Sequence, residues 1–70
     1  AVAREGPGHL VVEGPRVVTF VEMMDLEMEG ARDEVDRRLD RWGVAKALRR
    51  AGVLPGDTVR FGEVELIWHG

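Results

Sequence analysis

The absence of cysteine is the strongest constraint on how this chain can fold, because a 70-residue domain has few other ways to reinforce a small core. A chain this short buries only about 60% of the surface that it exposes when unfolded, so its stability margin is thin. Neither disulfides nor cysteine-based zinc sites are open to it. Stability must therefore come from apolar side chains repeated at helix and strand spacing. The lack of cysteine also fits a reducing compartment, and we expect a cytoplasmic location.

The first eight residues are predicted to form a tether. Residues 1–8 contain the turn-prone run Gly6-Pro7-Gly8, and the first residue is not Met, as expected for part of a longer protein. The folded domain is therefore expected over residues 9–70. No stretch approaches the roughly 18 apolar residues of a membrane span. Nine of the ten basic residues are Arg, and Asn and Gln are absent, which suggests a thermophilic or GC-rich source.

Three helices are predicted from apolar residues at helical spacing. The first covers residues 15–23, and residues 24–29 are expected to be extended because apolar and acidic residues alternate there. The second helix covers residues 31–42, with an apolar stripe on one side and acid-first pairs with Arg on the other. Gly43 ends it, and the third helix covers residues 44–51.

Three β-rich runs, at residues 9–13, 58–61 and 64–68, are predicted to be strands. Gly62-Glu63 joins the last two runs as a tight hairpin. The sequence therefore predicts an α+β fold. In this single small domain, an antiparallel sheet of three to four strands, including the C-terminal hairpin, packs against two to three short helices.

The chain offers little for catalysis. The phosphate-binding loop of nucleotide hydrolases needs a Gly-rich turn followed by Lys and a hydroxyl, but Lys46 is the only Lys and lies within a predicted helix. Ser and Cys are absent, and neither Thr lies near a His in the sequence, so no activated nucleophile is predicted. We therefore expect no catalytic, cofactor-binding or metal-binding residue in this chain.

Three sets of side chains leave a second interpretation open. His9 and His69 could meet and hold a metal with nearby carboxylates if the first and last strands paired, although exposed terminal histidines are the simpler interpretation. The aromatic residues could stack on nucleobases, although their positions on apolar faces favour the core. The three Met could line an adaptable binding surface, because Met23 and Met24 cannot both face inward on a helix.

Charge points to one local surface for contacts with a partner. The net charge of −3 argues against strong direct nucleic-acid binding by the whole domain. Lys46, Arg49 and Arg50 nevertheless share one side of a predicted helix, and Arg60 could extend this basic face because that helix leads into its strand. These four residues are the candidate partner-contact residues, with a solvated helix face as the alternative.

The second half of the chain has a helix ending in Gly-Val-x-x-Ala-Leu-x-x-Ala-Gly (residues 43–52), followed by Gly-Asp-Thr-Val-x-Phe-Gly (residues 56–62) and an apolar strand. This pattern resembles the C-terminal domain of the Obg family of GTPases. Residues 12–15 are similar to the opening of that domain, and residues 33–42 to its long helix. Residues 24–30 differ from the Asp/Asn-rich segment of the family.

This resemblance implies a multidomain parent with a glycine-rich N-terminal domain and a central G domain that binds GTP and magnesium. Such proteins associate with the large ribosomal subunit, act in its assembly and are linked to the guanosine tetraphosphate stress response. By resemblance, this chain would be a non-catalytic accessory or regulatory domain, with the parent G domain and the ribosome as its partners. No catalytic motif of the family falls within these residues.

Two other functions remain open at this point. A small free-standing RNA-binding module is the first, since Gly-Asp-Thr-Val at a strand start also occurs in small β-barrel RNA binders. The second is an enzyme with an unusual site, which would need a pocket that holds His9 or His69 with carboxylates.

Overall fold

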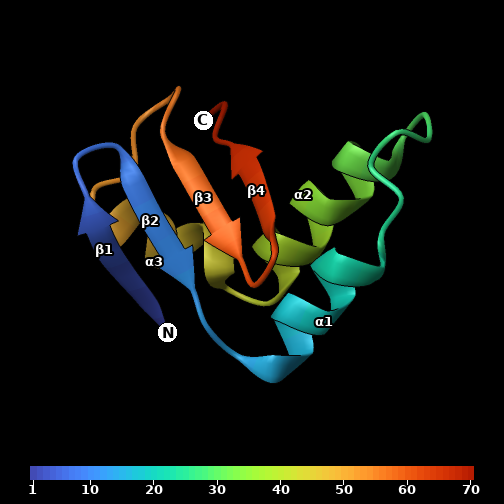
Figure 1. The fold of residues 1–70 in the computed structure, drawn as a ribbon, viewed down its shortest axis with the longest axis horizontal. Helices are drawn as coiled ribbons and strands as arrows, with labels where there is room; N and C mark the ends of the chain where they lie inside the picture. The colour runs from blue at the N-terminus through green and yellow to red at the C-terminus, as the bar shows by residue number, and fades with distance from the viewer.

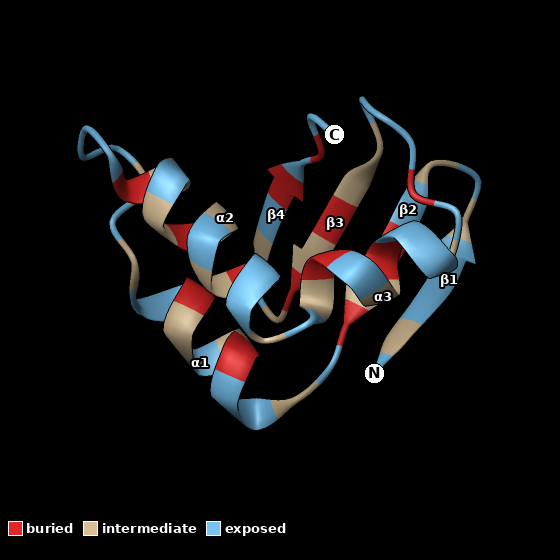
Figure 2. Ribbon diagram, turned by 180° about the vertical axis from the view of Figure 1, so that it is seen from behind, coloured by how far each residue is buried: buried red, intermediate tan, exposed pale blue.

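The computed structural model describes residues 1–70 as a four-stranded sheet with three helices on one of its faces (Figure 1). The elements are β1 (Val2–Gly6), β2 (His9–Val12), α1 (Pro15–Met23), α2 (Ala31–Arg41), α3 (Val44–Arg50), β3 (Thr58–Phe61) and β4 (Val64–Ile67). From the opposite side, the helices lie in front of the sheet (Figure 2). The predicted α+β fold with a C-terminal hairpin is confirmed. None of the three helices has the length and apolar character that crossing a membrane requires.

The sheet is mixed, where the sequence analysis expected an antiparallel one. Its strand order is β1-β2-β3-β4, and the two outer pairs are antiparallel, but the central strands β2 and β3 run parallel. Parallel neighbours cannot be joined by a hairpin and need a long crossover. Here the crossover contains α1, α2 and α3, so the central pairing brings together strands that are about fifty residues apart in the chain.

Residues 1–8 form part of the sheet, which corrects the prediction of a tether. β1 pairs along β2, and the run Gly6-Pro7-Gly8 forms the turn between them. The Arg4 side chain reaches the end of α3, where its Nη2 donates to the carbonyl oxygens of Ala51 (3.2 Å) and Gly52 (3.3 Å). Backbone carbonyls at a helix C-terminus lack partners within the helix and carry partial negative charge, so a guanidinium there is stabilising. This long-range contact ties β1 to the helix layer.

The core lies between the sheet and the helices, and it contains no buried polar side chain. Alternate residues of the inner strands and of β4 face the helices, as the period of a strand requires. α1 and α3 each contribute two buried residues from their apolar stripes, and α2 contributes three. The core cluster consists of Leu10, Val12, Val17, Val21, Val35, Leu39, Ala45, Leu48, Val53, Val59, Phe61, Leu66 and Trp68.

Two glycines allow close approaches that other residues would hinder. Gly43 adopts a φ of 77° and lets the chain bend sharply between α2 and α3, so that both apolar stripes face the same core. Gly62, with a φ of 61°, forms the β3–β4 turn directly beneath α1. A Cβ at this position would collide with the Glu22 carboxylate and come within 2.9 Å of the Val18 Cγ1 atom.

Residues 24–30 form a series of turns, which corrects the prediction of an extended segment over residues 24–29. Met24 and Leu26 pack against the core, while the acidic residues between and after them are exposed. Buried and exposed residues therefore alternate along this segment although it is not a strand. The Asp25 carboxylate accepts a hydrogen bond from the Glu27 N–H at 3.1 Å, which is a typical turn contact of Asp.

Replacing Arg4 with Ala should destabilise the domain by about 1 kcal/mol, because two α3 carbonyls lose a charged donor. For a domain of this size, that change corresponds to a fall of roughly 4–8 °C in the thermal midpoint. Thermal unfolding followed by circular dichroism measures it. Lys46→Ala is the control, since Lys46 is exposed and makes no side-chain hydrogen bond or ion pair. Equal midpoints for Arg4→Ala and the wild type would show that β1 is held without this contact.

Candidate partner-docking face

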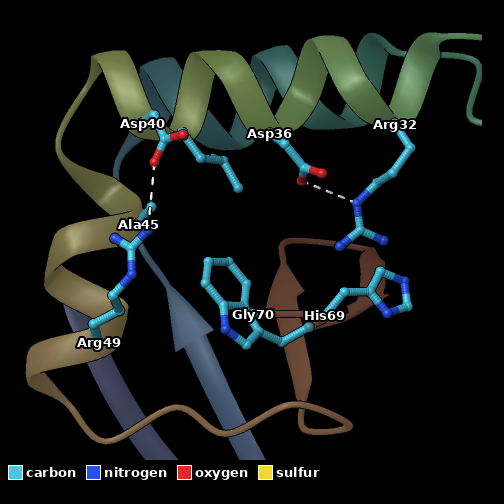
Figure 3. A pocket seen from close by; sticks show the side chains of 9 residues that line it. Arg32, Asp36, Asp40, Ala45, Arg49, His69 and Gly70 are labelled. Carbon is cyan, nitrogen blue, oxygen red and sulfur yellow. Dashed lines mark hydrogen bonds and ion pairs between the residues drawn. The ribbon is translucent and has the colours of Figure 1, made fainter.

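The outer side of α3 presents three basic side chains to solvent. Ala45 and Leu48 point into the core, which leaves Lys46, Arg49 and Arg50 exposed on the opposite side of this short helix. Neither Lys46 nor Arg50 makes an ion pair, and the nearest approach of Arg49 is a loose one, with 3.7 Å between its Nη2 and Asp40 Oδ1 (Figure 3). We call these three residues the α3 basic face. Their charges are available to a partner.

The overall negative charge hides an uneven distribution. Residues 31–50, which form α2 and α3, hold seven of the ten basic residues but only four of the thirteen acidic ones. The rest of the chain is correspondingly acidic. At physiological salt, charges interact over only about 8 Å, so a partner responds to the local surface more than to the net charge of the domain.

The arginines of α2 are largely engaged within the domain. Glu34 accepts a hydrogen bond from Arg37 at 2.8 Å, and this guanidinium lowers the pKa of the Glu34 carboxyl below its ordinary value of 4.5. The same pair raises the pKa of Arg37. Arg38 Nε lies 3.2 Å from Glu34 Oε2 but outside hydrogen-bond geometry, so that contact is chiefly electrostatic.

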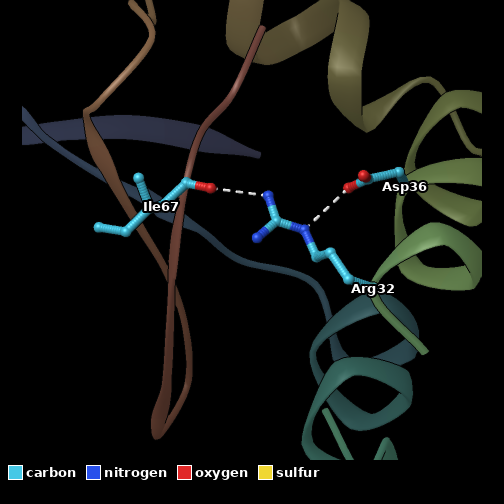
Figure 4. Close-up of polar contacts among 3 residues, drawn as sticks. All are labelled: Arg32, Asp36 and Ile67. Atoms are coloured by element: carbon cyan, nitrogen blue, oxygen red, sulfur yellow. Dashed lines mark hydrogen bonds and ion pairs between the residues drawn. The ribbon is translucent and has the colours of Figure 1, made fainter. Parts of the chain in front are cut away.

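Arg32 joins α2 to the edge strand β4 (Figure 4). Its Nη2 donates to the Ile67 carbonyl oxygen at 2.7 Å, and its Nε donates to Asp36 Oδ1 at 3.1 Å. One guanidinium thus satisfies an unpaired carbonyl of the sheet edge and a helix carboxylate together. Its donors are used within the fold, and Arg32 is not part of the α3 basic face.

Arg60 does not extend the α3 basic face, which corrects the sequence-based expectation. Because Val59 and Phe61 face the helices, Arg60 lies on the opposite face of the sheet. Its Nη2 donates to Glu5 Oε2 at 2.8 Å, and its Nη1 donates to the Gly62 carbonyl oxygen at 3.2 Å. The Glu5 carboxylate raises the pKa of Arg60. Sequence proximity to α3 was misleading, because alternation along a strand decides which side a residue takes.

A small hollow of about 120 Å³ lies beside the α3 basic face, between α2, α3 and the residues that follow β4 (Figure 3). Leu39, Ala45 and Trp68 provide its apolar lining, and the charged residues around it are of both signs. Most of these charges already pair with each other, which leaves little unbalanced charge to attract an ion.

The two histidines do not converge. β4 pairs with β3 and not with the first strands, so β3 separates the strand of His9 from the segment that carries His69. Both side chains are exposed. No group of three or more His, Cys, Asp or Glu residues is arranged to hold a metal ion.

The aromatic residues divide into two pairs. Phe61 and Trp68 are buried in the core, as expected. Phe20 and Trp42 are half-buried between α1 and α2, with an edge-to-face contact at 5.4 Å between ring centroids. The Arg38 guanidinium lies 4.8 Å from the Phe20 centroid, and that of Arg16 lies 5.5 Å from the Trp42 centroid. Sequence reasoning missed these cation–π contacts, because Arg16 is in α1 whereas Trp42 follows the end of α2.

Comparison with known proteins identifies the domain. A family model described as "Domain of unknown function (DUF1967)", which corresponds to the C-terminal domain of Obg, matches residues 1–68. The chain belongs to the C-terminal domain family of the Obg GTPases. The match includes β1, so the segment expected to be a tether is part of what the Obg C-terminal domains share.

Several curated relatives are proteins named GTPase Obg. The chain is 40% identical over 67 residues to the protein of Chloroflexus aggregans and 37% identical over 67 residues to that of Chloroflexus aurantiacus, in both cases over 96% of its length. It is 45% identical over 64 residues to the protein of Desulforudis audaxviator, which covers 91% of the chain. The matched part spans only 15% of each relative. No solved structure matches this Obg C-terminal domain at a significant level.

Replacing Glu34 with Gln should make the stability of this Obg C-terminal domain less dependent on pH. The pKa of Glu34 is lowered in the folded state, so its stabilising effect is complete above the unfolded-state pKa and is lost as the pH falls through the folded-state value. The variant should therefore have a lower thermal midpoint than the wild type near about pH 7, and this difference should shrink as the pH falls below 4.5. Glu29→Gln is the control, because Glu29 makes no ion pair. A midpoint difference that persists unchanged at acid pH would contradict this account.

Proposed function

We propose that this chain is the non-catalytic accessory domain of an Obg-like GTPase, and that it docks onto its parent G domain or onto the large ribosomal subunit. Through this docking it would serve ribosome assembly and the stress response in the cytoplasm. The α3 basic face is the contact surface. Its three exposed cations, of which only Arg49 makes a loose ion pair, lie within the most basic part of an otherwise acidic domain, and this is the observation that carries the proposal.

The location of the reactive groups supports a docking function. The relatives are named as GTPases, and the matched part is a small share of their length. The single Lys is on the outer side of α3, away from any Gly-rich turn that could enclose phosphates. In our proposal, GTP and magnesium therefore bind in a separate G domain of the parent.

The chemistry of the α3 basic face indicates the kind of surface that it contacts. Arg presents a planar fork of donors that matches carboxylate and phosphate groups, and Lys adds a compact charge. Arg49 makes only a loose ion pair with Asp40, at 3.7 Å. Breaking this pair to bind a partner would therefore cost the domain little stability. Ribosomal RNA phosphates, or an acidic surface of the G domain, are the complementary partners.

The small free-standing RNA-binding module is less well supported. Single-stranded RNA is usually held by stacking on exposed aromatic rings. In this domain, two of the aromatic residues are buried, and arginines lie over the rings of the other two. The alternative predicts tight binding of labelled RNA by the isolated chain at low salt, whereas our proposal predicts weak binding.

The double substitution Arg49→Gln/Arg50→Gln in the full-length parent should weaken its association with the large ribosomal subunit roughly tenfold, or about 1.4 kcal/mol. If phosphates are the partner, the salt dependence of binding should also become shallower, because fewer counterions are released. Co-sedimentation over a range of salt concentrations measures both effects.

Arg37→Gln/Arg41→Gln is the matched control. It removes two positive charges from the same helix layer but leaves the α3 basic face intact. The control should retain nearly full affinity. Equal losses in the two double variants would show that overall charge causes the effect. Unchanged binding in both would exclude the α3 basic face as the contact with the ribosome.

A further inference from the structure

The turns between α1 and α2 expose two methionines. Met23, at the end of α1, is 81% exposed, and Met28, within the turns, is 64% exposed. Met24 takes the inward position instead, which settles the question of which of the two adjacent methionines faces the core. Exposed apolar side chains that form one patch on a protein surface often mark a contact surface.

These turns are held in place by the fold. Leu26 packs against the core between the two exposed methionines. The Met28 N–H donates to the Asp25 carbonyl oxygen, and the Ala31 N–H donates to the Met28 carbonyl oxygen, each at 3.1 Å. Ordered turns therefore present Met28 outward, and its exposure does not come from fraying of a chain end.

The surroundings of the two methionines are acidic. No Lys, Arg or His occurs in residues 17–31, whereas four acidic residues do. Glu22 is engaged, because one of its carboxylate oxygens accepts a hydrogen bond from the Glu63 N–H at 3.0 Å. Asp25, Glu27 and Glu29 are exposed in the same turn segment, within two residues of Met23 or Met28 in the sequence. We call the set of Met23, Asp25, Glu27, Met28 and Glu29 the acidic methionine surface.

This surface is separate from the α3 basic face. The two views show the α1–α2 turns projecting at one end of the molecule and α3 lying toward the other end, near β1 (Figures 1 and 2). An inference about the acidic methionine surface therefore does not depend on the proposed function of the α3 basic face.

The combination of charges and methionines selects one class of partner. Unbranched thioether side chains adapt to differently shaped apolar groups. Carboxylates around them attract Lys and Arg but repel nucleic-acid phosphates and anionic lipid headgroups. We propose that the acidic methionine surface docks a basic amphipathic segment of a protein partner, whose apolar side chains cover Met23 and Met28 while its cations pair with the carboxylates.

The test uses the 70-residue chain with ¹³C-labelled methionine methyl groups, followed by NMR during titration with a synthetic helical Leu/Lys peptide. A Leu/Glu peptide of the same length is the charge control. The methyl signals of Met23 and Met28 should shift, and that of Met24 should change little, because it packs against the core. The Leu/Glu peptide should cause no shift.

The double variant Met23→Gln/Met28→Gln separates docking from simple charge attraction, because it retains all the carboxylates. We expect it to weaken binding of the Leu/Lys peptide roughly tenfold. Leu54→Gln is the matched control, since Leu54 is 63% exposed but lies in a different loop. This variant should bind the Leu/Lys peptide as tightly as the wild type does. The Met24 signal reports whether each variant is folded.

Three results would overturn the proposal. Unchanged affinity of the double methionine variant would show that charge alone causes binding. Equal binding of the Leu/Glu peptide would show that the carboxylates do not select the partner. Shifts of Met23 and Met28 that depend only on protein concentration, without peptide, would assign the surface to contacts between copies of this chain.

Discussion

The parallel pairing of β2 with β3 is the constraint on which the rest of this domain depends. In its register, Leu10 lies opposite Val59, and Val12 lies opposite Phe61, so four of the most buried residues meet at the centre of the sheet. The pairing can form only when the whole helical crossover lies over the sheet. All three apolar stripes must then pack on the same face, and this requirement positions every other feature.

The two surfaces discussed above follow from this arrangement. Once Ala45 and Leu48 are directed into the core, the basic residues of α3 must lie outward. In the turns before α2, packing of Met24 and Leu26 leaves Met23, Met28 and the acidic residues exposed. The fold thus separates positive from negative surface along one small molecule.

Local patterns allowed much of the fold to be predicted. Helical spacing and the positions of glycines predicted the three helices to within a residue or two, and the hairpin followed from alternation around Gly62-Glu63. β1 was missed because Ala3-Arg4-Glu5 has little apolar character, and because Gly6-Pro7-Gly8 is as typical of a linker as of a turn. The pairing of β1 with β2 and the contact of Arg4 with the end of α3 show that the run is a turn, and the second of these is not local.

The candidate site was predictable only in part, for the same reason. One helix face contains Lys46, Arg49 and Arg50, so helical spacing placed them together correctly. Arg60 could join these three residues only if its face of β3 met the helices. The pairing of β3 with β2 decides which face does so. Similarly, Met23 and Met24 are adjacent at the end of α1, so one of them must be exposed. Only the packing of the folded domain shows that the exposed one is Met23.

The most direct test of the account compares the full-length parent with a parent that lacks these residues, measuring GTP turnover and affinity for the large ribosomal subunit in the same preparations. If this chain is a docking domain built on the β2–β3 pairing, the shortened protein should retain its turnover and lose much of its affinity. Loss of turnover with undiminished affinity would contradict the account, because the contact with the ribosome would then not depend on these residues.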